Sequence, residues 1–287
     1  MTEKMRRSLN FQGSKISVLT AGDATNPTLL LIHGFPSSSH SFRNVIDELS
    51  KNYFLVAPDL PGFGCSDVVQ RPSFSKFASI VEAILEILGI RSFHLYLHDY
   101  GAVVGLYLAT RRPESIRSLI IQNANAHASG MGRKWAATRN YWENPSPETE
   151  AKATSHLTLE GTKYQYVGDI PEDISAQIPS QLWAEDWRVM SQPGHLKLQK
   201  SLILDYRRHV ARFDEIKNYL KEHQPPALLL WGRHDAFFDI KEVLSWMKDL
   251  PRMEGHILDG PHFLLETHAD ECSALITNFL KKVQSAV

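Results

Sequence analysis

The sequence is poor in cysteine, in net charge and in long apolar runs. Its 287 residues include two cysteines, Cys65 and Cys272, which are too few for a disulfide framework or a zinc site. A net charge of −1 provides no basic surface for nucleic acid or for an anionic membrane. No stretch approaches the ~18 consecutive apolar residues of a membrane span. We therefore expect no nucleic-acid partner, no membrane association and no metal ion.

The N-terminal residues also lack the apolar segment of a secretory signal. Residues 1–7 read MTEKMRR and lead into a polar stretch. Because we also expect the two thiols to remain reduced, we predict a cytoplasmic protein. Hydrophobic residues make up 43% of the chain and charged residues 22%, which is typical of a globular protein. The length suits one large α/β domain with an insertion, and we expect a monomer or a homodimer.

Short apolar runs alternate with amphipathic segments over most of the chain. Continuous apolar runs indicate strands buried on both faces, and apolar residues at helical spacing indicate helices between them. This alternation predicts an α/β fold with a mostly parallel sheet flanked by helices, which binds ligands at the carboxyl ends of its strands. The predicted strands cover residues 9–11, 16–19, 28–32, 53–57, 93–97, 116–122, 227–231 and 255–258.

The alternation stops between residues 128 and 224. This part of the chain is helical or loop-like in pattern and rich in tryptophan and tyrosine. We interpret it as a helical cap inserted over the ligand-binding edge of the sheet. The prediction is an α/β core formed by residues 1–127 and 225–287, with residues 128–224 as the cap.

One predicted strand passes into a helix through a turn of about four residues that carries Asp99. Backbone N–H groups and the helix dipole favour a carboxylate at such a position, so a simple N-cap is one interpretation. A strand–turn–helix that lifts one reactive side chain is also the geometry of a nucleophile turn. The pentapeptide Gly-x-Ser-x-Gly, which usually supplies a serine there, is absent. Asp99 is therefore the candidate nucleophile.

Two further residues complete a catalytic arrangement. Asp235 and His262 each follow a predicted strand, and they come after Asp99 in the order nucleophile, acid, histidine. The other strand end that could supply the acid, around Asn123, carries amides but no carboxylate. Asp239 also lies nearby, and we interpret it as structural or solvated.

Three stretches carry a resemblance to a known family. They are His33-Gly34-Phe35-Pro36, His98-Asp99-Tyr100-Gly101 and Gly260-Pro261-His262-Phe263. Over its whole length the chain resembles the α/β-hydrolase superfamily. It resembles most closely the branch with an aspartate nucleophile, which contains epoxide hydrolases and haloalkane or haloacetate dehalogenases.

The resemblance implies a mechanism without a cofactor. Asp99 would attack a carbon that bears a leaving group and form an alkyl ester. His262, oriented by Asp235, would then activate water. The backbone N–H groups of Phe35 and Tyr100 would stabilise the oxyanion, and a cis bond before Pro36 would direct the Phe35 N–H inward.

The leaving group depends on donors from the cap. Residues 204–208, LDYRR, resemble the epoxide-hydrolase segment that carries an acidic tyrosine, so Tyr206 is the candidate proton donor. Spacing does not choose a second donor among Tyr141, Tyr164 and Tyr166. Tyr100 stands where the related enzymes have tryptophan or arginine. Epoxide hydrolysis is the first interpretation, and dehalogenation is the second.

The substrate is predicted to be a small apolar or aromatic organic molecule that reacts with water. A cofactor-free lyase or a non-catalytic ligand-binding homologue remains an alternative on the same fold. The residues expected to bind the substrate are His33, Pro36, His98, Tyr164, Tyr166, Trp183 and Trp187.

Overall fold

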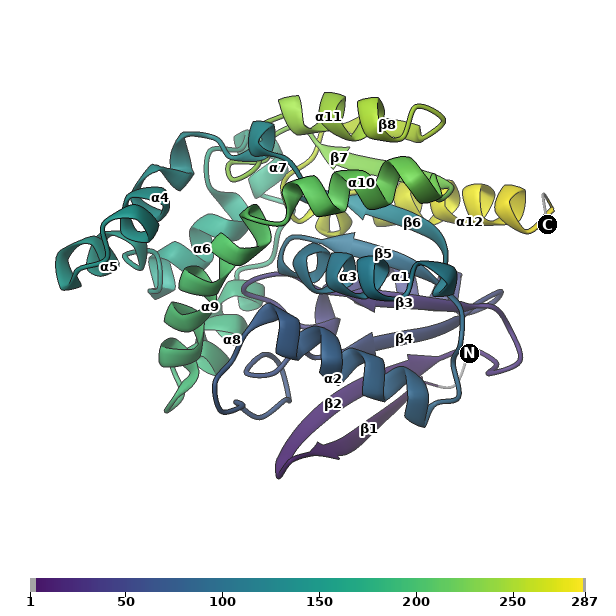
Figure 1. Ribbon diagram of the computed structural model, residues 1–287, viewed down its shortest axis with the longest axis horizontal. Helices are drawn as coiled ribbons and strands as arrows, with labels where there is room; N and C mark the ends of the chain where they lie inside the picture. The colour runs from purple at the N-terminus through teal and green to yellow at the C-terminus, as the bar shows by residue number, and fades with distance from the viewer. Residues whose placement is uncertain (1–3, 286–287) are drawn as a thin grey trace.

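The structure, a computed structural model, describes residues 4–285 and contains one eight-stranded sheet (Figure 1). Residues 1–3, which belong to the charged stretch MTEKMRR, lie outside this description. The strand order is β1-β2-β4-β3-β5-β6-β7-β8, and all pairs from β4 to β8 are parallel. The predicted α/β fold with a mostly parallel sheet is confirmed. The strands are β1 (Lys4–Phe11), β2 (Ser14–Ala21), β3 (Thr28–Ile32), β4 (Phe54–Pro58), β5 (Phe93–His98), β6 (Ile116–Gln122), β7 (Ala227–Gly232) and β8 (Glu254–Leu258).

Helices follow most of the strands and also fill the long segment between β6 and β7. Short 3-10 turns link several of them, including residues 39–42 before α1 and residues 264–266 before α12. The α-helices are α1 (Arg43–Leu49), α2 (Phe74–Ile87), α3 (Tyr100–Arg111), α4 (Ala136–Glu143), α5 (Pro147–Ala153), α6 (Leu159–Val167), α7 (Glu172–Ser175), α8 (Gln181–Met190), α9 (His195–Val210), α10 (Phe213–His223), α11 (Lys241–Asp249) and α12 (Ala269–Ser285).

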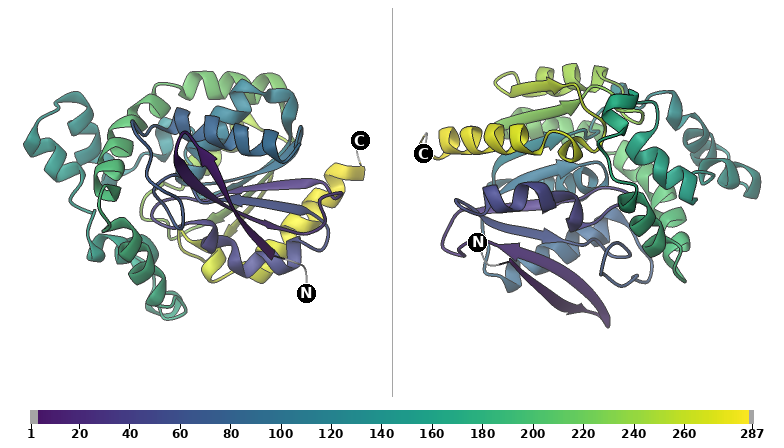
Figure 2. Two further views of the ribbon diagram at one scale, coloured as in Figure 1. Left: turned by 90° about the horizontal axis from the view of Figure 1, so that it is seen from below. Right: turned by 180° about the vertical axis from the view of Figure 1, so that it is seen from behind.

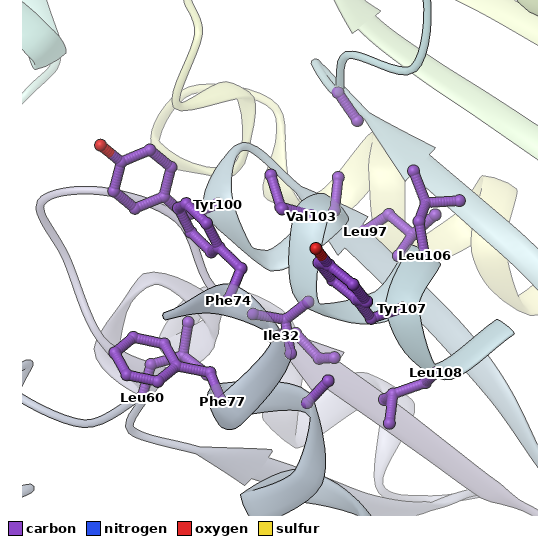
Figure 3. Packing of buried hydrophobic residues seen from close by; sticks show 14 of the residues in the cluster. Ile32, Leu60, Phe74, Phe77, Leu97, Tyr100, Val103, Leu106, Tyr107 and Leu108 are labelled. Carbon is purple, nitrogen blue, oxygen red and sulfur yellow. The ribbon is translucent and has the colours of Figure 1, made fainter. Parts of the chain in front are cut away.

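The two faces of the sheet bury different hydrophobic clusters. Because side chains alternate along a strand, Leu29 and Leu31 of β3 pack with residues of α1 and α12 on one face. Leu30 and Ile32 pack on the other face with α2 and α3. Figure 3 shows the second cluster, in which aromatic side chains from α2 lie beside the start of α3. Both faces are covered, which explains why the central strands are apolar throughout.

The turn between β5 and α3 is possible because of two glycines. A Cβ atom on Gly101 would lie 2.0 Å from the carbonyl oxygen of Ile32. A Cβ atom on Gly34 would lie 2.4 Å from the Cβ atom of Asp99. Neither distance is possible for real side chains, so both positions require glycine. The start of α3 therefore packs directly on the end of β3, and the two loops meet at Asp99.

Seven helices, α4 to α10, lie between β6 and β7. Helices α4 to α9 lie together beyond one end of the sheet, on the left in Figure 1, and the two further views show the same grouping (Figure 2). Helix α10 differs, because it packs on α3 and α11 and its Ile216 and Leu220 join the cluster on that face of the sheet. We call residues 128–224 the helical insertion. Its last helix therefore lies on the core, although the predicted boundary counts it with the cap.

Within residues 4–285, no helix combines the length and the apolar character needed to cross a membrane. Cys65 is exposed and Cys272 is buried, and the two are not joined by a disulfide.

Candidate active site

Asp99 occupies a sharp turn between β5 and α3. Its backbone has φ 47° and ψ −120°, a conformation that non-glycine residues rarely adopt and that is concentrated at functional sites. Its Oδ1 accepts a hydrogen bond of 2.7 Å from the backbone N–H of Phe35. The backbone amide of Tyr100 also lowers the pKa of this carboxyl and so favours its ionised form. Two backbone amides thus act on one carboxylate, whose side chain is 12% exposed.

His262 lies between Asp99 and Asp235. Its Nδ1 is 2.8 Å from Oδ2 of Asp235, and its Nε2 is 3.9 Å from Oδ2 of Asp99. Because a carboxylate accepts, Nδ1 donates its proton to Asp235, and in the neutral form of the ring Nε2 faces Asp99 with its lone pair. The other oxygen of Asp235 accepts from the N–H groups of Phe237 at 2.7 Å and Phe238 at 3.0 Å. The three residues that the sequence predicts to act together are therefore adjacent.

Asn123 supports the acid, a role that the sequence analysis did not assign. Its Nδ2 donates to Oδ2 of Asp235 at 2.8 Å, and its Oδ1 accepts from the N–H of Gly232 at 2.9 Å. Asn123 has a positive φ of 39°, which asparagine tolerates better than most residues. The signal in the sequence is an amide at the end of a predicted strand. An amide at that position does not by itself indicate that it contacts the acid.

Burial and charge act in opposite directions at this site. Burial raises the pKa of Asp99, although His262 and the two backbone donors oppose this effect. Burial lowers the pKa of His262. The carboxylates of Asp235 and Asp99 raise it by more than burial lowers it, so the pKa lies above its usual value. Burial also places the pKa of His98 well below its usual value, so this ring beside His262 is neutral. Within the described residues, no group of three His, Cys, Asp or Glu side chains is arranged to hold a metal ion.

A cavity of about 240 Å³ opens over Asp99 between the core and the helical insertion. Tyr206 of α9 lines it, and its hydroxyl is buried without a hydrogen-bond partner. Burial, followed by the charge of Asp99, raises the pKa of Tyr206 well above its usual value, so the phenol keeps its proton. The lining residues are Phe35, Asp99, Tyr100, Lys134, Trp135, Ala137, Thr138, Lys152, Ala153, Ser155, His156, Tyr164, Gln165, Ile203, Tyr206 and Phe237.

Comparison with known families identifies the family of this fold. A family model described as the alpha/beta hydrolase fold matches residues 27–269. The chain belongs to the α/β-hydrolase family. The resemblance inferred from the three motifs is therefore confirmed, and the protein is a hydrolase of this fold.

Individual relatives of this α/β hydrolase have different names. An uncharacterized hydrolase of Saccharomyces cerevisiae is 33% identical over 263 residues, which cover 89% of this chain and 90% of the relative. Epoxide hydrolase 3 of Xenopus tropicalis is 26% identical over 303 residues, covering 94% and 76%. The solved structure of haloalkane dehalogenase DbeA from Bradyrhizobium elkani matches with a TM-score of 0.79 at 19% identity, covering 99% and 100%. That last likeness shows the fold alone.

Several polar groups around the cavity of this α/β hydrolase are already engaged. The indole N–H of Trp135 donates to the carbonyl of Phe237 at 3.0 Å. The indole N–H of Trp142 donates to the carbonyl of Ile203 at 2.8 Å. The hydroxyl of Tyr164 is hydrogen-bonded to Lys134 and Asp169 at the exposed rim. The Tyr206 hydroxyl is thus the buried lining donor that is left without an acceptor.

Of the residues expected to bind substrate, only Tyr164 lines this cavity. The ring nitrogens of His33 are used within the core, by the N–H of Leu60 and the carbonyl of Gly34. His98 Nε2 lies 3.2 Å from the carbonyl oxygen of His262, so it supports that loop. Pro36 is buried and does not line the cavity, and it follows a cis peptide bond, as predicted.

The remaining aromatic residues of that prediction also lie outside the cavity. Tyr166 stacks on Phe263 at 4.2 Å, and its hydroxyl donates to Asp186. Trp183 packs beside Tyr166, and Trp187 is half-buried against the main core. Their positions differ from the prediction because aromatic composition does not indicate which helix face meets the substrate. His156, which the sequence analysis did not select, lines the cavity instead and packs edge-on against Phe35.

Proposed function

We propose that this α/β hydrolase converts epoxides into diols through a covalent ester on Asp99. The observation that carries the proposal is the Tyr206 hydroxyl, which is buried, protonated and unpartnered in the cavity that also exposes Asp99. Opening an epoxide by a carboxylate requires a proton for the departing oxygen. Nucleophile and proton donor thus face one small, largely apolar space. We also propose that the helical insertion, residues 128–224, acts as the cap that supplies this donor.

In the first step, Oδ2 of Asp99 attacks an epoxide carbon. This oxygen is the available one, because Oδ1 is held by the N–H of Phe35. The C–O bond of the ring breaks, and the departing oxygen takes the proton of Tyr206. The product is a hydroxyalkyl ester of Asp99 and a tyrosinate.

In the second step, Nε2 of His262 takes a proton from water and the hydroxide adds to the carboxyl carbon of Asp99. The N–H groups of Phe35 and Tyr100 stabilise the oxyanion; losing one such donor typically costs ~10²–10³ in rate. When the ester breaks, the leaving alcohol takes the proton from His262. The carboxyl proton then returns to Tyr206, and epoxide plus water has become a diol.

Carbon–halogen cleavage is the competing reaction. A halide leaving group needs N–H donors rather than a proton, and the indole N–H groups of Trp135 and Trp142 already bond to backbone carbonyls. The unpartnered donor is a hydroxyl that keeps its proton, and a hydroxyl can give that proton to a departing oxygen. This arrangement favours the epoxide.

The test compares diol formation from styrene oxide with halide release from 1-chlorobutane on one purified sample. We expect diol formation, and we expect Tyr206→Phe to lower its rate by ~10²–10⁴, the usual contribution of a general acid. Tyr219→Phe is the matched control, because this buried hydroxyl also lacks a partner but does not line the cavity. Halide release without diol formation, or full activity of Tyr206→Phe, would contradict the proposal.

A further inference from the structure

Helix α9 is hydrogen-bonded to the α/β core on both sides of Tyr206. Oδ2 of Asp205 accepts a hydrogen bond of 2.8 Å from the backbone N–H of Phe74, the first residue of α2. His209 Nε2 donates to the carbonyl of Asn125, which follows β6, at 2.8 Å. Both side chains are buried, with exposed fractions of 8% and 0%. The helix that carries the proposed proton donor is therefore attached to the core by the residue before Tyr206 and by the residue three positions after it.

The partner of Asp205 is a helix N-terminus, where the first N–H groups have no acceptor within the helix. Ser73 caps α2 and accepts from the N–H of Lys76 at 3.1 Å. The N–H of Phe74 remains, and Asp205 satisfies it from the helical insertion. A negative charge at this end of α2 is also favoured by the helix dipole. The contact is thus well matched in both hydrogen bonding and charge.

The contact of Asp205 also sets the direction of Tyr206. Consecutive residues of an α-helix point about 100° apart, because 3.6 residues complete one turn. Once Asp205 is held against α2, the rotation of α9 about its axis is fixed, and with it the direction of Tyr206. His209, one turn further along α9, packs edge-on against the Tyr206 ring at 5.2 Å.

Phe74 itself connects this contact to the site. Its ring packs edge-on against Tyr100 at 4.9 Å and against Tyr206 at 5.9 Å, and Figure 3 shows it beside Tyr100. Residue 74 therefore binds Asp205 through its backbone N–H, and its ring packs against both Tyr100 and Tyr206, whose rings also lie 6.1 Å from each other. One residue of α2 thus contacts the helix of the proton donor, the donor itself and the residue that follows the nucleophile.

We propose that Asp205 is a positioning residue, which holds the Tyr206 hydroxyl over Asp99 by accepting the N–H of Phe74. The inference rests on the proposed function, because it assigns Asp205 to the step in which Tyr206 gives its proton. It predicts that loss of this contact slows formation of the Asp99 ester and leaves the later hydrolysis unchanged, since His262 and the oxyanion donors belong to other elements.

The experiment measures how fast styrene oxide adds its mass to the Asp99 peptide in a His262→Gln background, in a single turnover. Asp205→Leu should slow this step about 10²-fold, the scale of a misplaced catalytic group. Asp205→Asn keeps an acceptor and should remain close to the parent. Arg208→Ala is the matched control, because it removes only the exposed ion-pair partner of Asp205. If Asp205→Leu does not fold, Asp205→Glu, whose longer side chain displaces α9, should show the same slowing.

A double-mutant cycle separates positioning from general damage. If Asp205 acts through Tyr206, adding Asp205→Leu to Tyr206→Phe should cause no further slowing. An equal slowing in both backgrounds, or an unchanged rate in Asp205→Leu, would overturn the positioning role alone. Absence of any adduct in the parent would instead overturn the proposed function. A crystal structure of Asp205→Leu with the Tyr206 hydroxyl still facing Asp99 would overturn the positioning role whether or not an epoxide reacts.

Discussion

At the residue scale, the carboxylate of Asp235 controls how easily His262 accepts a proton. Burial lowers the pKa of His262, but the carboxylates of Asp235 and Asp99 outweigh this effect, so the pKa is raised above its usual value. Histidine acts as a base only when it is neutral, so a raised pKa moves the acidic limb of the reaction to higher pH. During ester hydrolysis Asp99 is esterified and carries no charge. Asp235 is then the carboxylate that determines the position of the limb.

Asp235→Asn should therefore move the acidic limb of ester hydrolysis to lower pH and lower the plateau rate. The pKa of His262 falls when the carboxylate is removed, and the ring loses the partner that orients it. The measurement is the single-turnover hydrolysis rate of the Asp99 ester as a function of pH. Asp239→Asn, a change in a partly buried neighbour whose carboxylate accepts from the N–H of Lys241 rather than from His262, serves as the control. A limb that stays in place in Asp235→Asn would contradict this role.

At the scale of elements, α11 holds both ends of the helical insertion. Oε1 of Glu242 accepts from the backbone N–H groups of Ala126 at 2.7 Å and His127 at 3.1 Å, where the chain leaves the core. The His127 ring lies between Glu242 and Asp249, at 2.8 Å and 3.2 Å. Where the chain returns, the side chain of Gln224 donates to the carbonyl of Asp249 at 2.8 Å. Helix α11 of the core thus anchors both segments that connect the core to the helical insertion.

Glu242→Ala should lower the free energy of unfolding by about 3–5 kcal/mol, the usual cost of removing one partner of a buried ion pair. It leaves two backbone N–H groups and Nδ1 of the His127 ring without their acceptor. Urea denaturation measures the change. Glu86→Ala is the control, because Glu86 is 70% exposed and its ion pair with Arg112 is 3.9 Å long, so it should change stability by less than about 1 kcal/mol. Equal stability of Glu242→Ala and the parent would contradict the anchoring role.

Most elements of the core could be predicted from the sequence, because buried parallel strands are continuous apolar runs. The runs at residues 28–32 and 116–122 coincide with β3 and β6. Helix α2 begins at Phe74, because the side chain of Ser73 caps it and accepts from the N–H of Lys76. The packing of α10 on the core could not be predicted, because an amphipathic pattern does not say which surface covers it.

At the scale of the whole molecule, the sheet explains why the site could be predicted in part. Parallel strands place their carboxyl ends at one edge, so Asp99, Asp235 and His262 meet once the strands are identified. No comparable rule predicts which side chains of the helical insertion face the substrate cavity. The helices of the insertion and the core together line the cavity that includes Tyr206, while Tyr166 and the two tryptophans of α8 lie outside it.

Burying the ionised carboxylate of Asp99 should lower the free energy of unfolding of the whole protein. Burial raises the pKa of Asp99, so the ionised carboxyl is less favourable in the folded state than in the unfolded chain. Asp99→Asn should increase the free energy of unfolding at neutral pH. The gain should shrink as the pH falls through the folded pKa of Asp99 and vanish below its unfolded value, where both states are protonated.

Urea denaturation of Asp99→Asn at several pH values measures this effect. Asp47→Asn is the control, because the Asp47 side chain is 71% exposed and its substitution should change stability by no more than about 0.5 kcal/mol. If Asp99→Asn unfolds at a lower urea concentration than the parent at neutral pH, burial does not disfavour the ionised carboxyl and the expected gain is wrong.

The central claim is that the Asp99 carboxylate becomes covalently bonded to the substrate. It is tested most directly by mass spectrometry of the Asp99-containing peptide after His262→Gln protein has been incubated with styrene oxide. The account predicts that this peptide gains the mass of the epoxide, and that the gain disappears when Asp99→Ala is added. Diol production by the unsubstituted protein, without any such adduct in His262→Gln, would contradict it.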